Sequence, residues 1–422
     1  MNKKLFWSII VLIHIVFFAK QLFFKHSIIK DGIEYLFAAE NLINHQTLYS
    51  WDLKDNYELK WLTKRPFLYP SILAFFKLLS FGNIHLFVFL ILLVQNLISI
   101  FCIHLAIKTL EKLHVKIKLK WALIFILITP AQFIYANLIM TEIWLQCCLI
   151  CLVYIHFNNQ FQTSKKVLLL GLCIVAAMSL KPVMAPFAFI FPLYYLIIKQ
   201  KKLIPLLFLP LFFYFGSNYI NLKRTGYYHY SSISTINLLQ YNTYLTIMNK
   251  HGIDYADSIV DKITYDSKQL NSYKEEQEYR QMECKKIIKD NLGLYAYLHL
   301  KGMLVSFIDP GRFDITQFFN LKHNEILMYE TNTGNKFEKL KKIFLSPIGL
   351  VLILLILANV FKAIFYLKYL FSSPLFNNQK IALILIPAYI ITLTGIIGTS
   401  RFLIPLFPIL FIIFLISNQK KA

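Results

Sequence analysis

Apolar residues fall in long runs along this chain, and two long polar segments interrupt them. Several runs reach the roughly 20 residues that a helix needs to cross the apolar core of a bilayer. In lipid such a run must be helical, because an unpaired backbone group is costly there. The pattern predicts ten transmembrane helices, at residues 5–24, 84–107, 121–138, 142–157, 166–180, 183–198, 203–222, 345–367, 380–398 and 402–417.

Each of the two long polar segments contains shorter stretches whose apolar residues predict helices that do not span the membrane. The first contains the apolar run Ser71–Phe81, which is too short to span and should lie at the membrane interface. In the second, Lys274–Asn291 has apolar residues at helical spacing, and Leu292–Ile308 is typical of an interfacial helix. We therefore predict an all-α integral membrane protein in three parts: an N-terminal transmembrane module (1–222) with a long first outer loop (25–83), an outer segment with amphipathic helices (223–344), and C-terminal transmembrane helices (345–422).

Composition agrees with the membrane class, since 57% of residues are hydrophobic and only 16% are charged. A net charge of +22 is also typical of nucleic-acid binding. Here, however, the lysines stand beside apolar runs, as the positive-inside rule requires of cytoplasmic loops, so we expect no nucleic-acid partner. This distribution predicts that both termini are cytoplasmic. Twenty of the 22 acids fall in the two long segments, which agrees with an outer position for both.

Five of the six cysteines lie in predicted spans, so we interpret Cys147, Cys148 and Cys151 as packing residues and not as a metal site. The sequence has no Walker loop, dinucleotide fingerprint or zinc-protease motif, which argues against soluble nucleotide donors. Richness in Lys, Ile, Asn and Phe is typical of AT-rich bacterial genomes and points to a bacterial plasma membrane.

Candidate chemistry begins at Asp31, which follows the first span by a few residues. A carboxylate at the outer membrane surface is suited to accept a proton from an attacking hydroxyl. Alternatively, Asp31 is the N-cap of a helix over Gly32–Leu42, and the two roles are compatible. Glu34 lies one helical turn further on, so the two acids are predicted to share a site. For Glu40 we favour a solvated surface position.

Basic residues at outer positions are candidates for binding phosphate. Lys64 and Arg65 precede the interfacial run, where the alternative is snorkelling to lipid headgroups. Glu142 and Lys181 stand at predicted outer ends of spans, and such positions indicate an aqueous cavity. Arg401 begins the last span on the outer side, where topology gives no reason for a cation, so we predict a phosphate partner. Structural pairing with an outer-loop acid is the alternative.

Taken in order, several loose motifs resemble those of the GT-C glycosyltransferases, in particular the protein O-mannosyltransferase and aminoarabinose-transferase type. They are Asp31-x-x-x-Tyr35-x-x-x-Ala39, Arg65-Pro66-x-x-Tyr69-Pro70, Thr141-Glu142, Lys181-Pro182 and Arg401-Phe402-x-x-Pro405-x-x-Pro408. Two departures are Gly32, where many relatives have a second acid, and Arg65-Pro66-Phe67 in place of a double proline.

The resemblance implies an enzyme that takes a sugar from a polyprenyl phosphate at the outer leaflet and inverts the anomeric centre. It implies that Asp31 is the base, with Glu34 beside it. It also implies that Lys64, Arg65 and Arg401 bind the lipid phosphate. The remaining residues of these motifs are candidates to line the cavity: Tyr35, Tyr69, Glu142 and Lys181.

Several alternatives stay open at this point. No cofactor is required, but a divalent cation held by Asp31 and Glu34 is a second possibility. The acceptor is a lipid, a glycan or a protein. A transporter or flippase for lipid-linked glycans would need charge pairs at mid-membrane and two related halves. A polysaccharide polymerase or ligase would use a large late outer loop, and the segment 223–343 is compatible with that.

Overall fold

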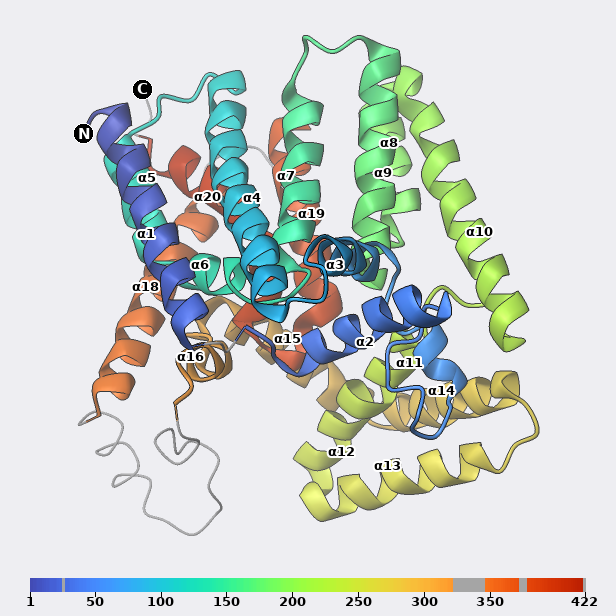
Figure 1. Cartoon of the computed structure of the whole chain (residues 1–422). Helices are drawn as coiled ribbons and strands as arrows, with labels where there is room; N and C mark the ends of the chain where they lie inside the picture. The colour runs from blue at the N-terminus through green and yellow to red at the C-terminus, as the bar shows by residue number, and fades with distance from the viewer. Residues whose placement is uncertain (25–26, 322–345, 372–377, 420–422) are drawn as a thin grey trace.

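The computed structural model describes residues 1–24, 27–321, 346–371 and 378–419. Within these ranges every regular element is a helix, as predicted (Figure 1). In the described part of the chain, six helices are long and apolar enough to cross a membrane. They are α1 (Lys3–Phe24), α4 (Ile84–Lys112), α8 (Thr163–Leu180), α10 (Phe208–Thr225), α18 (Pro347–Phe371) and α19 (Asn378–Thr394). Two of these spans include a short adjoining 3-10 helix: η3 (Lys201–Leu207) precedes α10, and η6 (Gly395–Ile397) follows α19.

Three further predicted spans correspond to shorter apolar helices, which are α7 (Glu142–Phe157), α9 (Phe187–Ile197) and α20 (Phe407–Ser417). Helix α4 lies inside the bundle and packs against α7, α1 and α20. Aromatic side chains fill much of the core; Phe125, for example, contacts the rings of Phe407, Phe411 and Phe414. These contacts join the N-terminal and C-terminal transmembrane parts into one bundle.

The predicted span 121–138 is not one helix. It divides into α5 (Leu119–Leu127) and α6 (Ala131–Ala136), because Pro130 has no amide hydrogen to continue α5 and disfavours helical backbone before it. The chain after α6 then runs through the bundle as a loop. Gln95 of α4 donates to the Leu138 carbonyl at 2.7 Å and its neighbour Asn96 to the Asn137 side chain at 2.8 Å. Buried polar groups of α4 thus satisfy an irregular segment that lipid alone would not tolerate.

The segment predicted as the first outer loop forms α2 (Lys30–His45), the turn η1 (Leu59–Leu62) and α3 (Leu68–Leu79). Helix α3 covers the predicted interfacial run Ser71–Phe81 except for its last two residues, and it packs against α2. Glu40, predicted to be merely solvated, forms an ion pair with Lys77 of α3. This loop therefore makes a compact layer against the membrane bundle.

The segment predicted as the second outer one forms six helices in its described part. They are α11 (Ile233–Asn237), α12 (Tyr244–His251), α13 (Ile253–Lys268), α14 (Tyr273–Asp290), α15 (Leu292–Ile308) and α16 (Arg312–Phe319). Helices α14 and α15 coincide within one residue with the predicted amphipathic and interfacial helices. Helix α15 leads back to the bundle and packs against η6 and η7 (Ser400–Leu403). The predicted outer segment ends in residues outside the described ranges.

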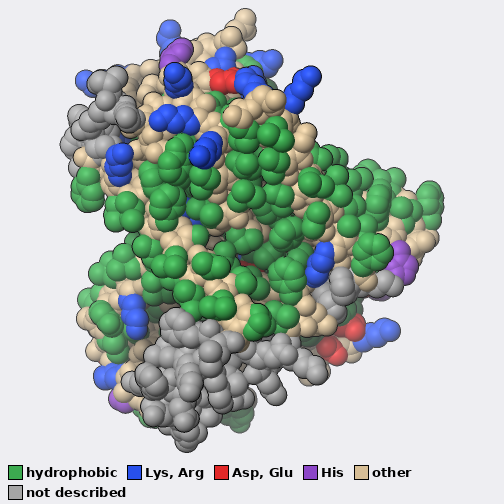
Figure 2. Space-filling model, turned by 90° about the vertical axis from the view of Figure 1, so that its left-hand side faces the viewer, with side chains coloured by type: hydrophobic (Ala, Val, Ile, Leu, Met, Phe, Trp, Pro, Cys, Tyr) green, Lys and Arg blue, Asp and Glu red, His purple; other side chains and the backbone are tan. Residues whose placement is uncertain are grey.

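Charge is distributed unevenly over the molecule. Lysine and arginine side chains gather at the end where α1 begins and α20 ends, above a band of hydrophobic side chains (top of Figures 1 and 2). Helices α11–α14 lie at the opposite end (Figure 1).

Candidate active site

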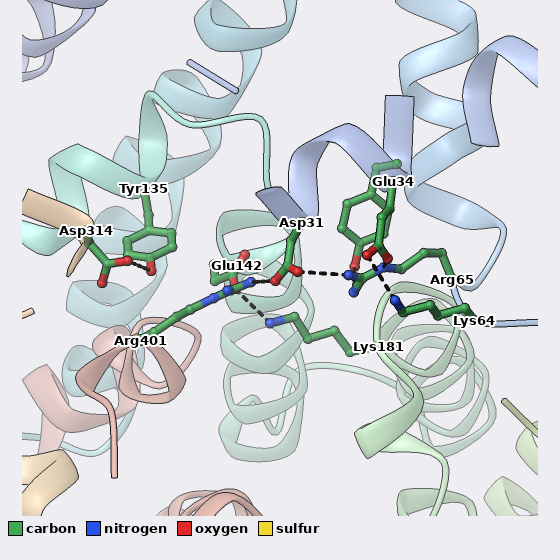
Figure 3. A network of polar contacts seen from close by, with 10 residues as sticks. Asp31, Glu34, Lys64, Arg65, Tyr135, Glu142, Lys181, Asp314 and Arg401 are labelled. Atoms are coloured by element: carbon green, nitrogen blue, oxygen red, sulfur yellow. Dashed lines mark hydrogen bonds and ion pairs between the residues drawn. The ribbon is translucent and has the colours of Figure 1, made fainter. Parts of the chain in front are cut away.

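Asp31 lies at the centre of a chain of ion pairs that joins five separate segments of the sequence (Figure 3). Its oxygen Oδ1 accepts from Arg65 at 3.0 Å, and Oδ2 accepts from Arg401 at 2.7 Å. Asp31 is not the N-cap of α2, contrary to the capping interpretation. The helix begins at Lys30, two residues before the predicted start at Gly32, and Ile29 occupies the cap position with no side-chain cap bond. The Asp31 carboxylate is bound by the two arginines instead.

Glu34 and the basic pair form one arm of this cluster. Glu34 Oε1 accepts from Lys64 at 2.9 Å, and Oε2 accepts from Arg65 Nε at 2.7 Å. Because Asp31 and Glu34 are one turn apart on α2, a single guanidinium reaches both, as the spacing predicted. The Glu34 side chain is only 8% exposed.

Arg401, Glu142 and Lys181 form the other arm. Glu142 Oε1 accepts from Arg401 Nε and from Lys181 Nζ, each at 2.8 Å. Glu142 is fully buried, and its second oxygen, Oε2, has no hydrogen-bond partner among the described residues. Arg401 therefore does pair with the outer-loop acid Asp31, which was the alternative to a phosphate partner.

Local backbone contacts fix the two ends of this cluster. A side chain on Gly32 would meet the Ile139 carbonyl oxygen at 2.9 Å, and the Ile139 amide donates to the Ser27 carbonyl at 2.8 Å. Glycine at position 32 thus lets α2 approach the loop after α6. On the other side, Asp309 accepts from both the amide and the hydroxyl of Ser400, at 2.7 and 2.8 Å. This holds the turn that presents Arg401.

The structure also identifies a carboxylate that sequence reasoning missed. Asp314 of α16 is buried and accepts from the Tyr135 hydroxyl at 2.6 Å, beside Arg401 (Figure 3). Burial raises the pKa of Asp314 to about 6. It is one of fourteen acids in the second outer segment, and no local pattern distinguishes it from the others.

The two tyrosines predicted to line the cavity are buried. Tyr35 lies beneath Arg65, with the guanidinium carbon 4.8 Å from the ring centroid, and contacts the Tyr69 ring edge to face at 5.1 Å. The Tyr69 hydroxyl donates to Gln95 at 3.0 Å. Both therefore form a floor under the cluster, and Arg65 gains a cation–π contact.

Two cavities adjoin the cluster. One, about 310 Å³ and partly open to solvent, has Arg65 in its wall together with Arg224, Phe67 and Tyr230. The other, about 70 Å³, is mostly apolar and has Ser400 and Asp314 in its wall. The Arg65 arm of the cluster thus reaches a cavity that is open to solvent, and the smaller cavity lies beside the turn that carries Arg401.

Electrostatics in the cluster favour the ionised form of Asp31. Burial works to raise the pKa of Asp31, but the charges of Arg401 and Arg65 outweigh it and hold the pKa well below its usual range. Among the described residues, no three His, Cys, Asp or Glu side chains are grouped to hold a metal ion. Asp31 and Glu34, the pair considered for a divalent cation, share the Arg65 guanidinium.

Comparisons with family models, with curated proteins and with solved structures give no match for this chain. The function must therefore be inferred from the chemistry of the site itself.

Proposed function

We propose that this chain is an integral membrane glycosyltransferase of GT-C type. It transfers a sugar from a polyprenyl-phosphate donor to an acceptor hydroxyl on the extracytoplasmic face, with inversion. In this proposal the chain crosses a bacterial plasma membrane ten times, with both termini in the cytoplasm. The acceptor is a lipid, a glycan or a protein.

The observation that carries this proposal is the position of Asp31 between two arginines from distant parts of the chain. Its side chain is 32% exposed, whereas those of Glu34 and Glu142 are 8% and 0% exposed. Asp31 is therefore the acid of this cluster that a substrate can reach. A carboxylate next to fixed cations matches a reaction that removes a proton and expels an anion.

The proposed step is one displacement at the anomeric carbon. The acceptor oxygen forms a bond to this carbon while its proton passes to Asp31. The bond from the anomeric carbon to the phosphate oxygen breaks, and the polyprenyl phosphate leaves with the electron pair. Arg401 and Arg65 stabilise the leaving phosphate, and such stabilisation is strongest where water is excluded. No metal is needed for this step, so we expect transfer to persist in a chelator.

The other acids of the cluster have a positioning role in this proposal. Glu34 orients Arg65 through Nε and also engages Lys64, which leaves Lys64 less free to bind phosphate than its sequence position implies. Glu142 orients Arg401 in the same way and holds Lys181 beside it. Removal of Glu34 takes the carboxylate from Lys64, and removal of Glu142 takes it from Lys181, whereas both arginines still bind Asp31.

A radiolabelled polyprenyl-phosphate sugar, offered to membranes with and without this protein, tests the proposal. We expect label to move to an acceptor only when the protein is present. Movement of the intact lipid across the membrane, with no transfer of the sugar, would instead support the flippase alternative. Incorporation into long polymers of label that is offered on a lipid-linked oligosaccharide, but not of label offered on the monosaccharide donor, would support a polymerase.

A further inference from the structure

The two arginines at Asp31 are held in the same way. Each uses its Nε to bind a buried glutamate, Arg65 to Glu34 at 2.7 Å and Arg401 to Glu142 at 2.8 Å. Each then directs a terminal nitrogen at Asp31, at 3.0 Å and 2.7 Å (Figure 3). The glutamates thus fix the guanidinium groups, and their free ends converge on one anionic position.

In the structure the Asp31 carboxylate fills that position, with one oxygen on each arginine. A carboxylate engaged in this way is a poor proton acceptor, and the depressed pKa of Asp31 agrees with this. The resting cluster therefore has its candidate base blocked by the groups that are needed for the leaving phosphate. A route that frees Asp31 is required.

The net charge of the cluster indicates which kind of ligand frees Asp31 from the two arginines. Its ion pairs involve four cations and three carboxylates, which leaves one surplus positive charge. A phosphodiester linking a sugar to a lipid carries a single negative charge at neutral pH. Its two unesterified oxygens have the same hydrogen-bonding chemistry as a carboxylate, and arginine binds both kinds of anion through paired N–H groups.

Resting on the proposed function, we propose that the phosphodiester of the lipid-linked donor replaces the Asp31 carboxylate between Arg65 and Arg401. Asp31 then turns away, is freed of both cations, and becomes the base. Donor binding therefore precedes productive acceptor binding, and the site has no free base until the donor is in place.

The backbone restricts how Asp31 moves. Gly32 is close enough to the Ile139 carbonyl that an added Cβ would lie 2.9 Å from it, and Ile139 is itself bonded to Ser27. This contact holds the start of α2 in place. Release of Asp31 is therefore a rotation of its side chain, and the arginines keep their positions because Glu34 and Glu142 do not move.

The test is a binding measurement that does not depend on transfer. The probe is a short-chain isoprenyl methyl phosphodiester, which has the donor's charge but no sugar, titrated into the purified full chain in lipid nanodiscs. Asp31→Asn should bind this probe about tenfold more tightly than wild type, because no resident carboxylate has to be displaced. The corresponding isoprenol, which lacks phosphate, should show no such difference.

Glu34→Gln is the matched control, since it removes the same charge from the same helix. If displacement operates, this variant binds the probe no more tightly than wild type, because Arg65 loses its anchor. Equal tightening by both variants would mean a general loss of negative charge and would overturn the proposal. Unchanged or weaker binding by Asp31→Asn would overturn it as well.

A structure of the wild-type chain with the probe gives a second readout that needs no variant. Phosphate oxygens should lie on the terminal nitrogens of Arg65 and Arg401, with Asp31 turned away. A bound probe with Asp31 still bridging both arginines would contradict the proposal. Failure here is distinct from failure of the proposed function, which would appear as absence of sugar transfer whatever the probe binds.

Discussion

Asp314 is buried at the edge of the ion-pair cluster, where the Tyr135 hydroxyl is its hydrogen-bond donor. Its pKa is raised by burial to about 6, so the folded protein holds this proton more tightly than the unfolded chain. Stability from this group is therefore fully present below the unfolded pKa, near 4, and is lost as the pH rises to about 6.

Replacement of Asp314 by Asn should remove this dependence and keep an acceptor for Tyr135. Relative to wild type, Asp314→Asn should gain about 2 kcal/mol of stability between pH 4 and pH 7, because only wild type has to ionise a buried acid over this range. Thermal unfolding in detergent at the two pH values measures this. A constant difference between variant and wild type would contradict it.

At the scale of single residues, the sequence was informative where a charged residue stands at the edge of an apolar run. Asp31, Arg65, Glu142, Lys181 and Arg401 stand at the edges of apolar runs, where a charge is conspicuous, and the structure brings all of them together. Asp314 is not conspicuous, because it lies among many other acids. Its partner Tyr135 is 179 residues away along the chain, so only the tertiary fold reveals the pair.

At the scale of elements, helix α15 packs against η6 and η7 and so supports the turn that carries Arg401. Gly302 faces η6 so closely that an added Cβ would lie 1.8 Å from the Gly395 carbonyl oxygen, which is backbone and has no rotamer to change. Only glycine permits this approach. Asp309, directly after α15, then binds Ser400, so the two contacts together position η7.

Gly302→Ala should therefore destabilise the protein by about 3 kcal/mol, because α15 must separate from η6. It should also weaken binding of a lipid phosphate through displacement of Arg401. Gly293→Ala is the matched control, since it lies on the same helix with no atom within 4 Å of the added methyl group. Equal unfolding temperatures for the two variants would show that this contact is unimportant.

Element prediction succeeded where apolar length alone decides the outcome, as for α1, α4 and α18. It failed at residues 121–138, where the average hydropathy hides a break at Pro130. The loop that follows α6 is buried, and its backbone depends on another helix, because Gln95 donates to the Leu138 carbonyl and Asn96 to the Ala136 carbonyl. Long-range partners of this kind cannot be found from a local pattern.

At the scale of the whole molecule, lysine and arginine side chains gather at the end where α1 begins and α20 ends, and helices α11–α14 lie at the opposite end (Figures 1 and 2). The proposed orientation predicts that α14 faces the cell exterior and the loop before α5 faces the cytoplasm. In intact cells, Met282→Cys should react with a membrane-impermeant maleimide, and Lys116→Cys should react only after permeabilisation. Both positions are exposed, and Cys284, the native cysteine of the outer segment, is buried. In intact cells, labelling of Lys116→Cys without labelling of Met282→Cys would contradict the proposed orientation and support the opposite one.

Transfer by Asp31→Asn tests the central claim most directly. With a labelled polyprenyl-phosphate sugar and equal amounts of inserted protein, this variant should transfer at least about 100-fold more slowly than wild type, because the proton acceptor is lost. Glu40→Gln, on the same helix but outside the cluster, should transfer at the wild-type rate. Near-normal transfer by Asp31→Asn would contradict the proposed role of Asp31 as the base.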